Sequence, residues 1–164
     1  EGKYNGWQMN PDELENRDIK FFDEVFSQIS KNYNIDLDRI YAVGHSNGSR
    51  FVNVLWKMRP EKFAAFITVA GPGGFWLKGA PQKSVWISFG QNDEIVPYKV
   101  QKFSSKQYLK AFKADENSAQ TNGEITSYKT SENKEIIIED RNAGHEFPKS
   151  SIPKMVEFLK RNHR

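Results

Sequence analysis

The stretch that decides the fold is YAVGHSNGSRF, residues 41–51. A short apolar run over residues 40–43 stops at Gly44, and an apolar-periodic segment follows Gly48. Ser46 therefore stands between two glycines, at the point where a strand should turn into a helix. One explanation is structural: the two glycines are there because they allow the strand to turn sharply into the helix. The other explanation is chemical: the tight turn holds the serine hydroxyl in a position from which it can attack a substrate.

The pattern on either side of this stretch alternates between helix and strand. Buried strands are predicted within residues 40–43, 62–72 and 84–93, and two strands joined by a turn within 124–130 and 134–140. Helices are predicted within 10–35, with Asn10 as N-cap and Pro11 at its first position, and over 47–58, 97–113 and 148–164. Residues 1–10 and the polar residues 114–123 are predicted to be loops. This alternation predicts an α/β fold with a doubly wound, mostly parallel sheet.

Three reactive side chains follow the carboxyl ends of three different strands. Ser46 follows residues 40–43, Asp93 follows 84–89, and His145 follows 134–139. Ligands of such sheets bind outside the carboxyl ends of the strands, so these residues are predicted to share one site. Their order along the chain is Ser, Asp, His.

Residues 44–48 fit the pattern G-x-S-x-G of a nucleophile elbow, whose glycines give the strained serine backbone room. A serine hydroxyl needs an adjacent base, and His145 supplies one. Asp93 is predicted to fix the imidazole tautomer and to stabilise the imidazolium. The backbone N–H of Asn47 is predicted to donate to the oxyanion.

Other candidates receive a structural interpretation. Asp140 is a rival for the acid, but Asp93 is preferred because it follows a strand separate from that of His145. His45 is interpreted as a packing or hydrogen-bonding residue, because one base and one acid suffice. The remaining candidates are expected to cap a turn or to face solvent: Asp36, Asp38, Glu94 and His163.

Four aromatic residues lie in loops or helix starts after strands: Phe75, Trp76, Tyr98 and Phe147. Such side chains could line an acyl or aryl pocket and bind substrate. Packing of the loops against the core explains them equally well, so both interpretations stay open.

The composition excludes several classes of function. The net charge is only +3 and the lysines are spread, so nucleic-acid binding is not expected. No apolar run approaches 18 residues, so no membrane span is expected. The absence of cysteine excludes disulfides, thiolate chemistry and cysteine-bound zinc. No metal-ligand spacing or phosphate-binding loop is visible, and no cofactor or metal is expected.

At these motifs the chain resembles the α/β-hydrolase superfamily, and within it the polyhydroxybutyrate depolymerase and feruloyl esterase group. The likeness rests on residues 33–71 around the serine, GQNDEIVPY at 90–98 and AGHEFP at 143–148. It implies a secreted or periplasmic serine hydrolase of carboxylic esters. The implied substrates are aryl esters such as feruloyl groups, acetylated sugars and short polyesters, whether small molecules or polymer-linked; the residues leave the oligomeric state open.

The chain departs from this family pattern in two places. Gly48-Ser49 stands where the group often has two glycines, and the upstream His-Gly loop that supplies a second oxyanion donor has no counterpart. We therefore expect residues 1–164 to form a single catalytic domain that lacks its N-terminal part. Alone it should be poorly soluble and nearly inactive, with the strand 40–43 short of one neighbour. Two alternatives remain: a serine peptidase of the prolyl oligopeptidase type, and a non-catalytic binding domain with an inert triad.

Overall fold

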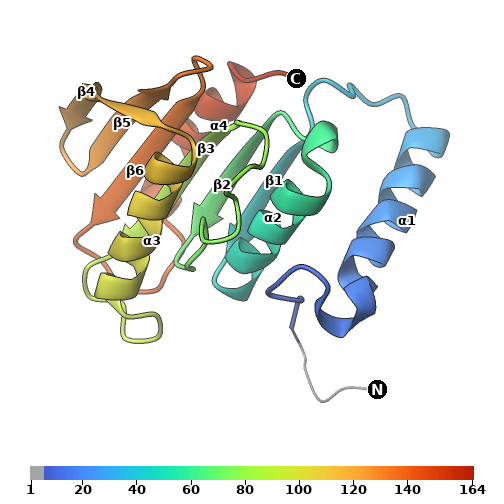
Figure 1. Ribbon diagram of the computed structural model, residues 1–164, viewed down its shortest axis with the longest axis horizontal. Coiled ribbons are helices and arrows are strands. Elements are labelled where there is room, and N and C mark those ends of the chain that lie inside the picture. The colour runs from blue at the N-terminus through green and yellow to red at the C-terminus, as the bar shows by residue number, and fades with distance from the viewer. Residues whose placement is uncertain (1–5) are drawn as a thin grey trace.

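The computed structural model describes residues 6–164, so the loop predicted for residues 1–10 is described only from Gly6 (Figure 1). The strands are β1 Tyr41–His45, β2 Ala65–Val69, β3 Ser84–Gly90, β4 Ala114–Asn122, β5 Ile125–Thr130 and β6 Glu135–Arg141. The helices are α1 Arg17–Asn32, α2 Asn47–Met58, α3 Tyr98–Ala111 and α4 Ile152–Lys160. Three short 3-10 turns complete the described elements: Glu13–Asn16, Pro60–Lys62 and Lys149–Ser151.

The six strands form one sheet in the order β1-β2-β3-β6-β5-β4. The pairs β1–β2, β2–β3 and β3–β6 are parallel, whereas β5 pairs antiparallel with both β6 and β4. The prediction of a mostly parallel α/β sheet is thus confirmed. Strands β2 and β3 are buried along their whole length, as expected for central strands covered on both faces.

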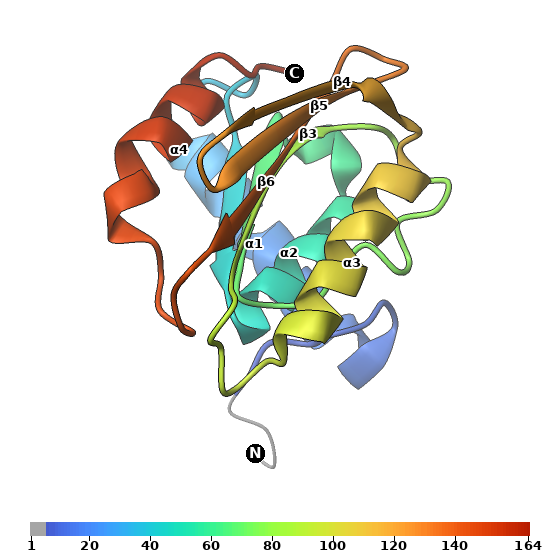
Figure 2. The same ribbon diagram turned by 90° about the vertical axis from the view of Figure 1, so that its left-hand side faces the viewer.

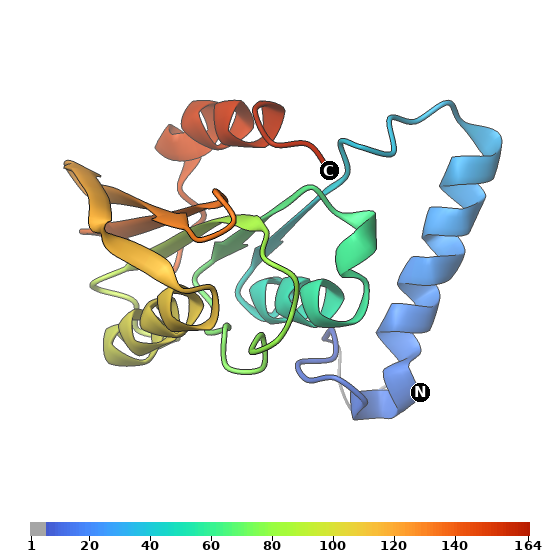
Figure 3. The same cartoon turned by 45° about the horizontal axis from the view of Figure 1, so that its top comes forward.

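Helices cover both faces of the sheet. Helices α2 and α3 lie on one side and α4 on the other (Figures 2 and 3). On the first face Trp56 of α2 stacks on Phe66 of β2, with ring centroids 4.6 Å apart. On the second face Phe158 of α4 meets Trp86 of β3 edge-on at 5.9 Å. These two apolar layers fix the strand ends that carry the site.

The prediction of a loop over residues 114–123 is wrong, because this segment is strand β4. Its residues are polar and mostly exposed, so no apolar alternation marks it. Backbone hydrogen bonds to β5 hold it, with an irregularity between Asp115 and Gln120 and a turn at Gly123, whose φ is +61°. An outer strand of this kind needs only one paired side, which sequence patterning does not detect.

The first helix begins later than predicted, at Arg17 instead of Pro11. Asn10 does not cap it; its N–H donates to the Glu13 carboxylate. The Asn16 side chain donates to Asp12 and accepts the Asp12 N–H, which closes a turn of left-handed residues before the helix. Local side-chain bonds of this kind compete with helix formation.

Helix α1 lies beside α2 at one end of the molecule (Figure 1). Asp23 of α1 forms an ion pair with Arg59 at 2.5 Å, and Phe22 stacks on Phe63 at 5.4 Å. Within residues 6–164, β1 pairs with β2 alone, so the predicted second neighbour of this strand stays a prediction. Over the same residues, no helix is both long and apolar enough to cross a lipid bilayer.

Candidate active site

Ser46 stands at a sharp turn between β1 and α2. Its φ of 56° and ψ of −119° fall where a residue with a side chain is strained, and its N–H donates to Val69 O at 2.8 Å. A Cβ at Gly44 would overlap the carbonyl oxygen of Gly48, so this position requires glycine. At Gly48, by contrast, a Cβ would meet no atom of residues 6–164 within 4 Å. Only the first glycine of the motif therefore makes room for the turn.

Asp93 lies in the loop after β3, and its side chain is fully buried. Its Oδ1 accepts the backbone N–H groups of Ile95 at 2.9 Å and Val96 at 2.8 Å. Its Oδ2 accepts from Gln101 Nε2 of α3 at 2.9 Å and from His145 at 2.8 Å. Burial alone would raise the pKa of Asp93, but the donors from Val96, His145, Ile95 and Gln101 together lower it below its ordinary value. The carboxylate is thus held ionised.

His145 lies in the loop after β6, and its Nδ1 faces Asp93 Oδ2 at 2.8 Å. An ionised carboxylate only accepts hydrogen bonds, so Nδ1 carries a proton and donates it. In the neutral ring Nε2 is then the free base. The end of β3 and the loop after β6 lie very close together. A Cβ at Gly90 would overlap the carbonyl oxygens of Ala143 and Gly144. Asn92 N–H donates to Ala143 O at 2.9 Å and closes the same contact.

Asp140, the rival acid, has other partners. Its Oδ2 accepts the Tyr98 hydroxyl at 2.8 Å, and its Oδ1 accepts from Gln91 Nε2 at 3.1 Å. Lys102 also lies near, with Nζ 3.7 Å from Oδ2. Of the two candidate acids it is Asp93, as the sequence favours, that contacts His145.

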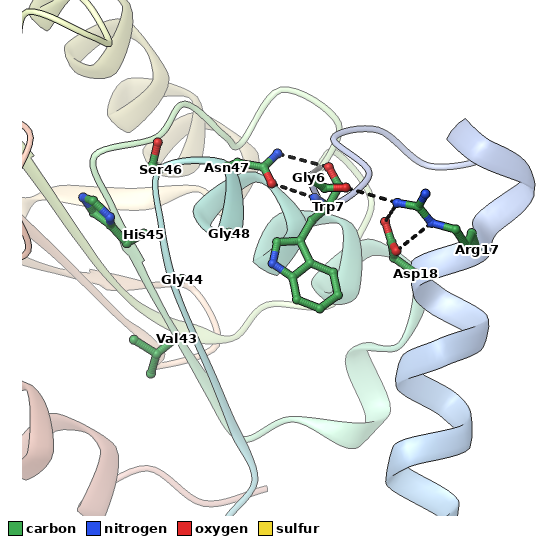
Figure 4. A pocket seen from close by; sticks show the side chains of 10 residues that line it. All are labelled: Gly6, Trp7, Arg17, Asp18, Val43, Gly44, His45, Ser46, Asn47 and Gly48. Atoms are coloured by element: carbon green, nitrogen blue, oxygen red, sulfur yellow. Dashed lines mark hydrogen bonds and ion pairs between the residues drawn. The ribbon is translucent and has the colours of Figure 1, made fainter. Parts of the chain in front are cut away.

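A cavity of about 730 Å³ opens beside Ser46 (Figure 4). It is lined by residues 43–48, Gly6, Trp7, Arg17 and Asp18. The Asn47 side chain bridges to Trp7 by accepting its N–H at 2.7 Å and donating to its carbonyl at 3.0 Å. Sequence reasoning missed Trp7 and Arg17, because an indole and a guanidinium in an N-terminal loop and first helical turn carry no motif.

The four predicted aromatic residues are not among the residues that line this cavity. Phe75 contacts Trp76 and Phe103, with ring centroids 6.0 and 5.9 Å away. Tyr98 packs on Phe89 at 5.9 Å, and its hydroxyl bonds to Asp140 as described above. Their role in substrate binding stays a prediction.

Phe147, the last of the four, lies next to His45 instead, with ring centroids 6.2 Å apart. The interpretation of His45 as a hydrogen-bonding residue fits its Nε2, which lies 2.5 Å from His145 O. Of the other structural candidates, Asp36 accepts the N–H of Asp38 at 3.0 Å and so closes the predicted turn. Glu94 and His163 are exposed.

Two further residues, Gln101 and Arg141, bond to Asp93 and to the loop of His145, respectively. Nothing in the sequence marks them for this role. Gln101 is 2 % exposed, although a glutamine in an amphipathic helix is usually expected at the surface. Arg141, at the end of β6, is 6 % exposed and donates from Nη2 to Glu146 O at 2.9 Å and from Nε to Ser88 Oγ at 3.0 Å. Across residues 6–164, no cluster of three or more His, Asp or Glu side chains is arranged to hold a metal ion.

The model of the prolyl oligopeptidase family matches residues 8–121, which is more than half of the chain and includes the elbow and Asp93. The chain belongs to the prolyl oligopeptidase family. This prolyl oligopeptidase family chain shares its α/β-hydrolase fold with a solved acetyl xylan esterase from Aspergillus awamori. That structure superposes with a TM-score of 0.70 at 16 % identity, over 97 % of this chain and 75 % of the other. A thermostable esterase superposes with a TM-score of 0.64 at 18 % identity, over 90 % of this chain and 37 % of the other.

Curated relatives of this prolyl oligopeptidase family member match shorter segments. A bifunctional acetylxylan esterase/xylanase of Neocallimastix patriciarum is 29 % identical over 97 residues, which are 58 % of this chain. A probable acetylxylan esterase A of Aspergillus flavus is 38 % identical over 60 residues, 36 % of this chain. The matches cover 14 % and 20 % of the lengths of these two relatives. The narrower resemblance to the depolymerase and feruloyl esterase group stays a prediction.

Proposed function

We propose that this protein hydrolyses carboxylic esters, with Ser46 as nucleophile, His145 as general base and Asp93 as the acid that orients it. The observation that carries the proposal is the pair of the buried Asp93 and the partly accessible His145, with Oδ2 and Nδ1 2.8 Å apart, at the same edge of the sheet as the strained Ser46 elbow. An imidazole oriented in this way takes the proton of a serine hydroxyl.

In the proposed reaction Ser46 Oγ attacks the carbonyl carbon of the ester, and His145 Nε2 takes the hydroxyl proton. The tetrahedral oxyanion accepts the N–H of Asn47, which starts α2, where free backbone donors and the helix dipole favour negative charge. His145 then protonates the leaving alcohol. Water then attacks the acyl-enzyme. His145 Nε2 takes a proton from this water and returns it to Ser46 Oγ, and the carboxylic acid product leaves.

Acetylated sugars are the substrate class that we place first, because the curated relatives are named acetylxylan esterases. Feruloyl or other aryl esters and short polyesters follow from the resemblance at the three motifs. A polymeric substrate would meet the enzyme outside the cell, which agrees with the predicted secreted or periplasmic location.

A peptidase is the second candidate, and the specific observation in its favour is the family model itself, which is that of the prolyl oligopeptidases. The same serine, histidine and aspartate would serve it. The alternative of a non-catalytic binding domain predicts that the serine is inert.

One panel of substrates tests these functions. The protein in its full natural length (below, the full chain) and its Ser46→Ala variant are assayed for acetate release from acetylated xylan, and for hydrolysis of methyl ferulate, a short polyester and a peptide anilide. We expect ester hydrolysis that Ser46→Ala abolishes. Faster cleavage of the anilide than of every ester would favour the peptidase, and no turnover of any substrate would contradict both enzyme functions.

A further inference from the structure

The loop that carries His145 is fixed at two successive carbonyl groups. Arg141 donates to the carbonyl of Glu146 at 2.9 Å and is itself tied to Ser88 of β3. His45 lies 2.5 Å, through Nε2, from the carbonyl oxygen of His145 itself. The first contact fixes the loop to the strand of the acid, and the second fixes it to the strand of the serine.

The second contact joins the strand end next to Ser46 to the backbone of His145. His45 is the last residue of β1 and is bonded directly to Ser46. A carbonyl oxygen only accepts, so Nε2 of His45 carries the proton of this hydrogen bond. The half-buried ring also packs near the ring of His145, with centroids 4.9 Å apart. In Figure 4 it projects from β1 on the side away from Asn47 and Trp7, so it does not compete for the oxyanion position.

We propose that His45 is a positioning residue, which acts through the backbone of His145 to set the place of the base relative to the adjacent Ser46. The proposal rests on the function proposed above. Serine and histidine come from strand ends that are not neighbours in the sheet, since β2 and β3 separate β1 from β6. The sheet alone does not fix the distance between the end of β1 and the loop that carries His145. The hydrogen bond from His45 links these two segments directly and so restricts their relative movement. Proton transfer is steep in distance, and a displacement of about 1 Å costs up to about a hundredfold in rate.

Two substitutions at this position separate the hydrogen bond from the ring. His45→Phe keeps an aromatic ring but removes the N–H, so the carbonyl of His145 loses its donor. His45→Gln loses the ring but keeps an N–H donor the same number of bonds from Cα. His163→Phe is the matched control, because His163 is exposed near the end of α4.

The measurements are kcat and KM for an aryl acetate, and hydrogen exchange at the backbone amides of residues 144–147, all on the full chain. We expect His45→Phe to lower kcat about ten- to a hundredfold with KM within about threefold, and to speed exchange in the loop. We expect His45→Gln to recover most of the kcat and of the protection, and His163→Phe to match the wild type.

Two results would overturn the proposal. One is a His45→Phe variant with wild-type kcat and exchange, even if its unfolding temperature falls, because His45 would then only contribute to stability. The other is a His45→Gln variant as impaired as His45→Phe, because the donor would then not matter. If the wild type hydrolyses no ester, the proposed function fails, while the exchange comparison still decides whether His45 holds the loop.

Discussion

Asp93 Oδ2 lies 2.8 Å from Nδ1 of His145, although the two residues are 52 positions apart and follow different strands. The carboxylate is fully buried and accepts three other hydrogen bonds. The imidazole that it orients is partly accessible, with 17 % of its side chain exposed. A buried carboxylate behind an accessible imidazole fits the roles proposed for Asp93 and His145.

Removal of the charge on Asp93 should therefore disable the base. We expect Asp93→Asn to lower kcat for an aryl acetate by about 10³–10⁴, because the wrong tautomer of His145 is then favoured, as in the triad of serine proteases. Asp140→Asn is the matched control and should stay within a few-fold of wild type, since Asp140 bonds to Tyr98 and Gln91 and its amide oxygen can still accept one of these hydrogen bonds. Equal losses in the two variants would show that the acid has been misassigned.

The lowered pKa of Asp93 also predicts a pH dependence of stability. A carboxylate whose pKa is lower in the folded state stabilises the protein above the unfolded pKa of about 3.9, and this contribution is lost as the pH falls through the folded value. The wild type should therefore be more stable than Asp93→Asn at about pH 6, and the difference should shrink below about pH 4. Urea unfolding of both proteins across this range measures it, and a constant difference would contradict the prediction.

The two glycines of the elbow should respond differently to alanine. Gly44→Ala forces a methyl group against the carbonyl of Gly48, so we expect a loss of about 3 kcal/mol or more in the free energy of unfolding. Gly48→Ala adds a methyl group at a helical position with open space among residues 6–164, and we expect a gain of about 0.5–1 kcal/mol. Chemical unfolding of the two variants tests this, and similar losses from both would show that the second glycine is also sterically required.

The alternation of apolar strands and helices is enough to predict the parallel sheet, and with it the position of Ser46, Asp93 and His145 after the carboxyl ends of three of its strands. Buried strands such as β3 leave an unbroken apolar signal, and the carboxyl ends of parallel strands share an edge by geometry. Strand β4 left no such signal because its side chains are mostly exposed. The start of α1 was misjudged because Asp12 and Asn16 bond to each other instead of leading into a helix.

The partners of the site residues could not be predicted, because they depend on how distant segments meet. Gln101 reaches Asp93 from α3, and Arg141 reaches the carbonyl of Glu146 from β6, and neither spacing forms a pattern in the sequence. The prediction for the four aromatic residues rests on their position after strands, which does not fix the direction of a side chain. The direction comes from packing, as with Phe147 against His45.

The central claim is that Ser46 is an activated nucleophile, and covalent labelling tests it most directly. The full chain is treated with a fluorophosphonate probe, and the modified peptide is mapped by mass spectrometry beside the Ser46→Ala, Asp93→Asn and His145→Ala variants. We predict one phosphonylated residue, Ser46, in the wild type, much slower labelling in the Asp93 and His145 variants, and none in Ser46→Ala. A wild type that stays unlabelled, or a label that persists in Ser46→Ala, would contradict the account.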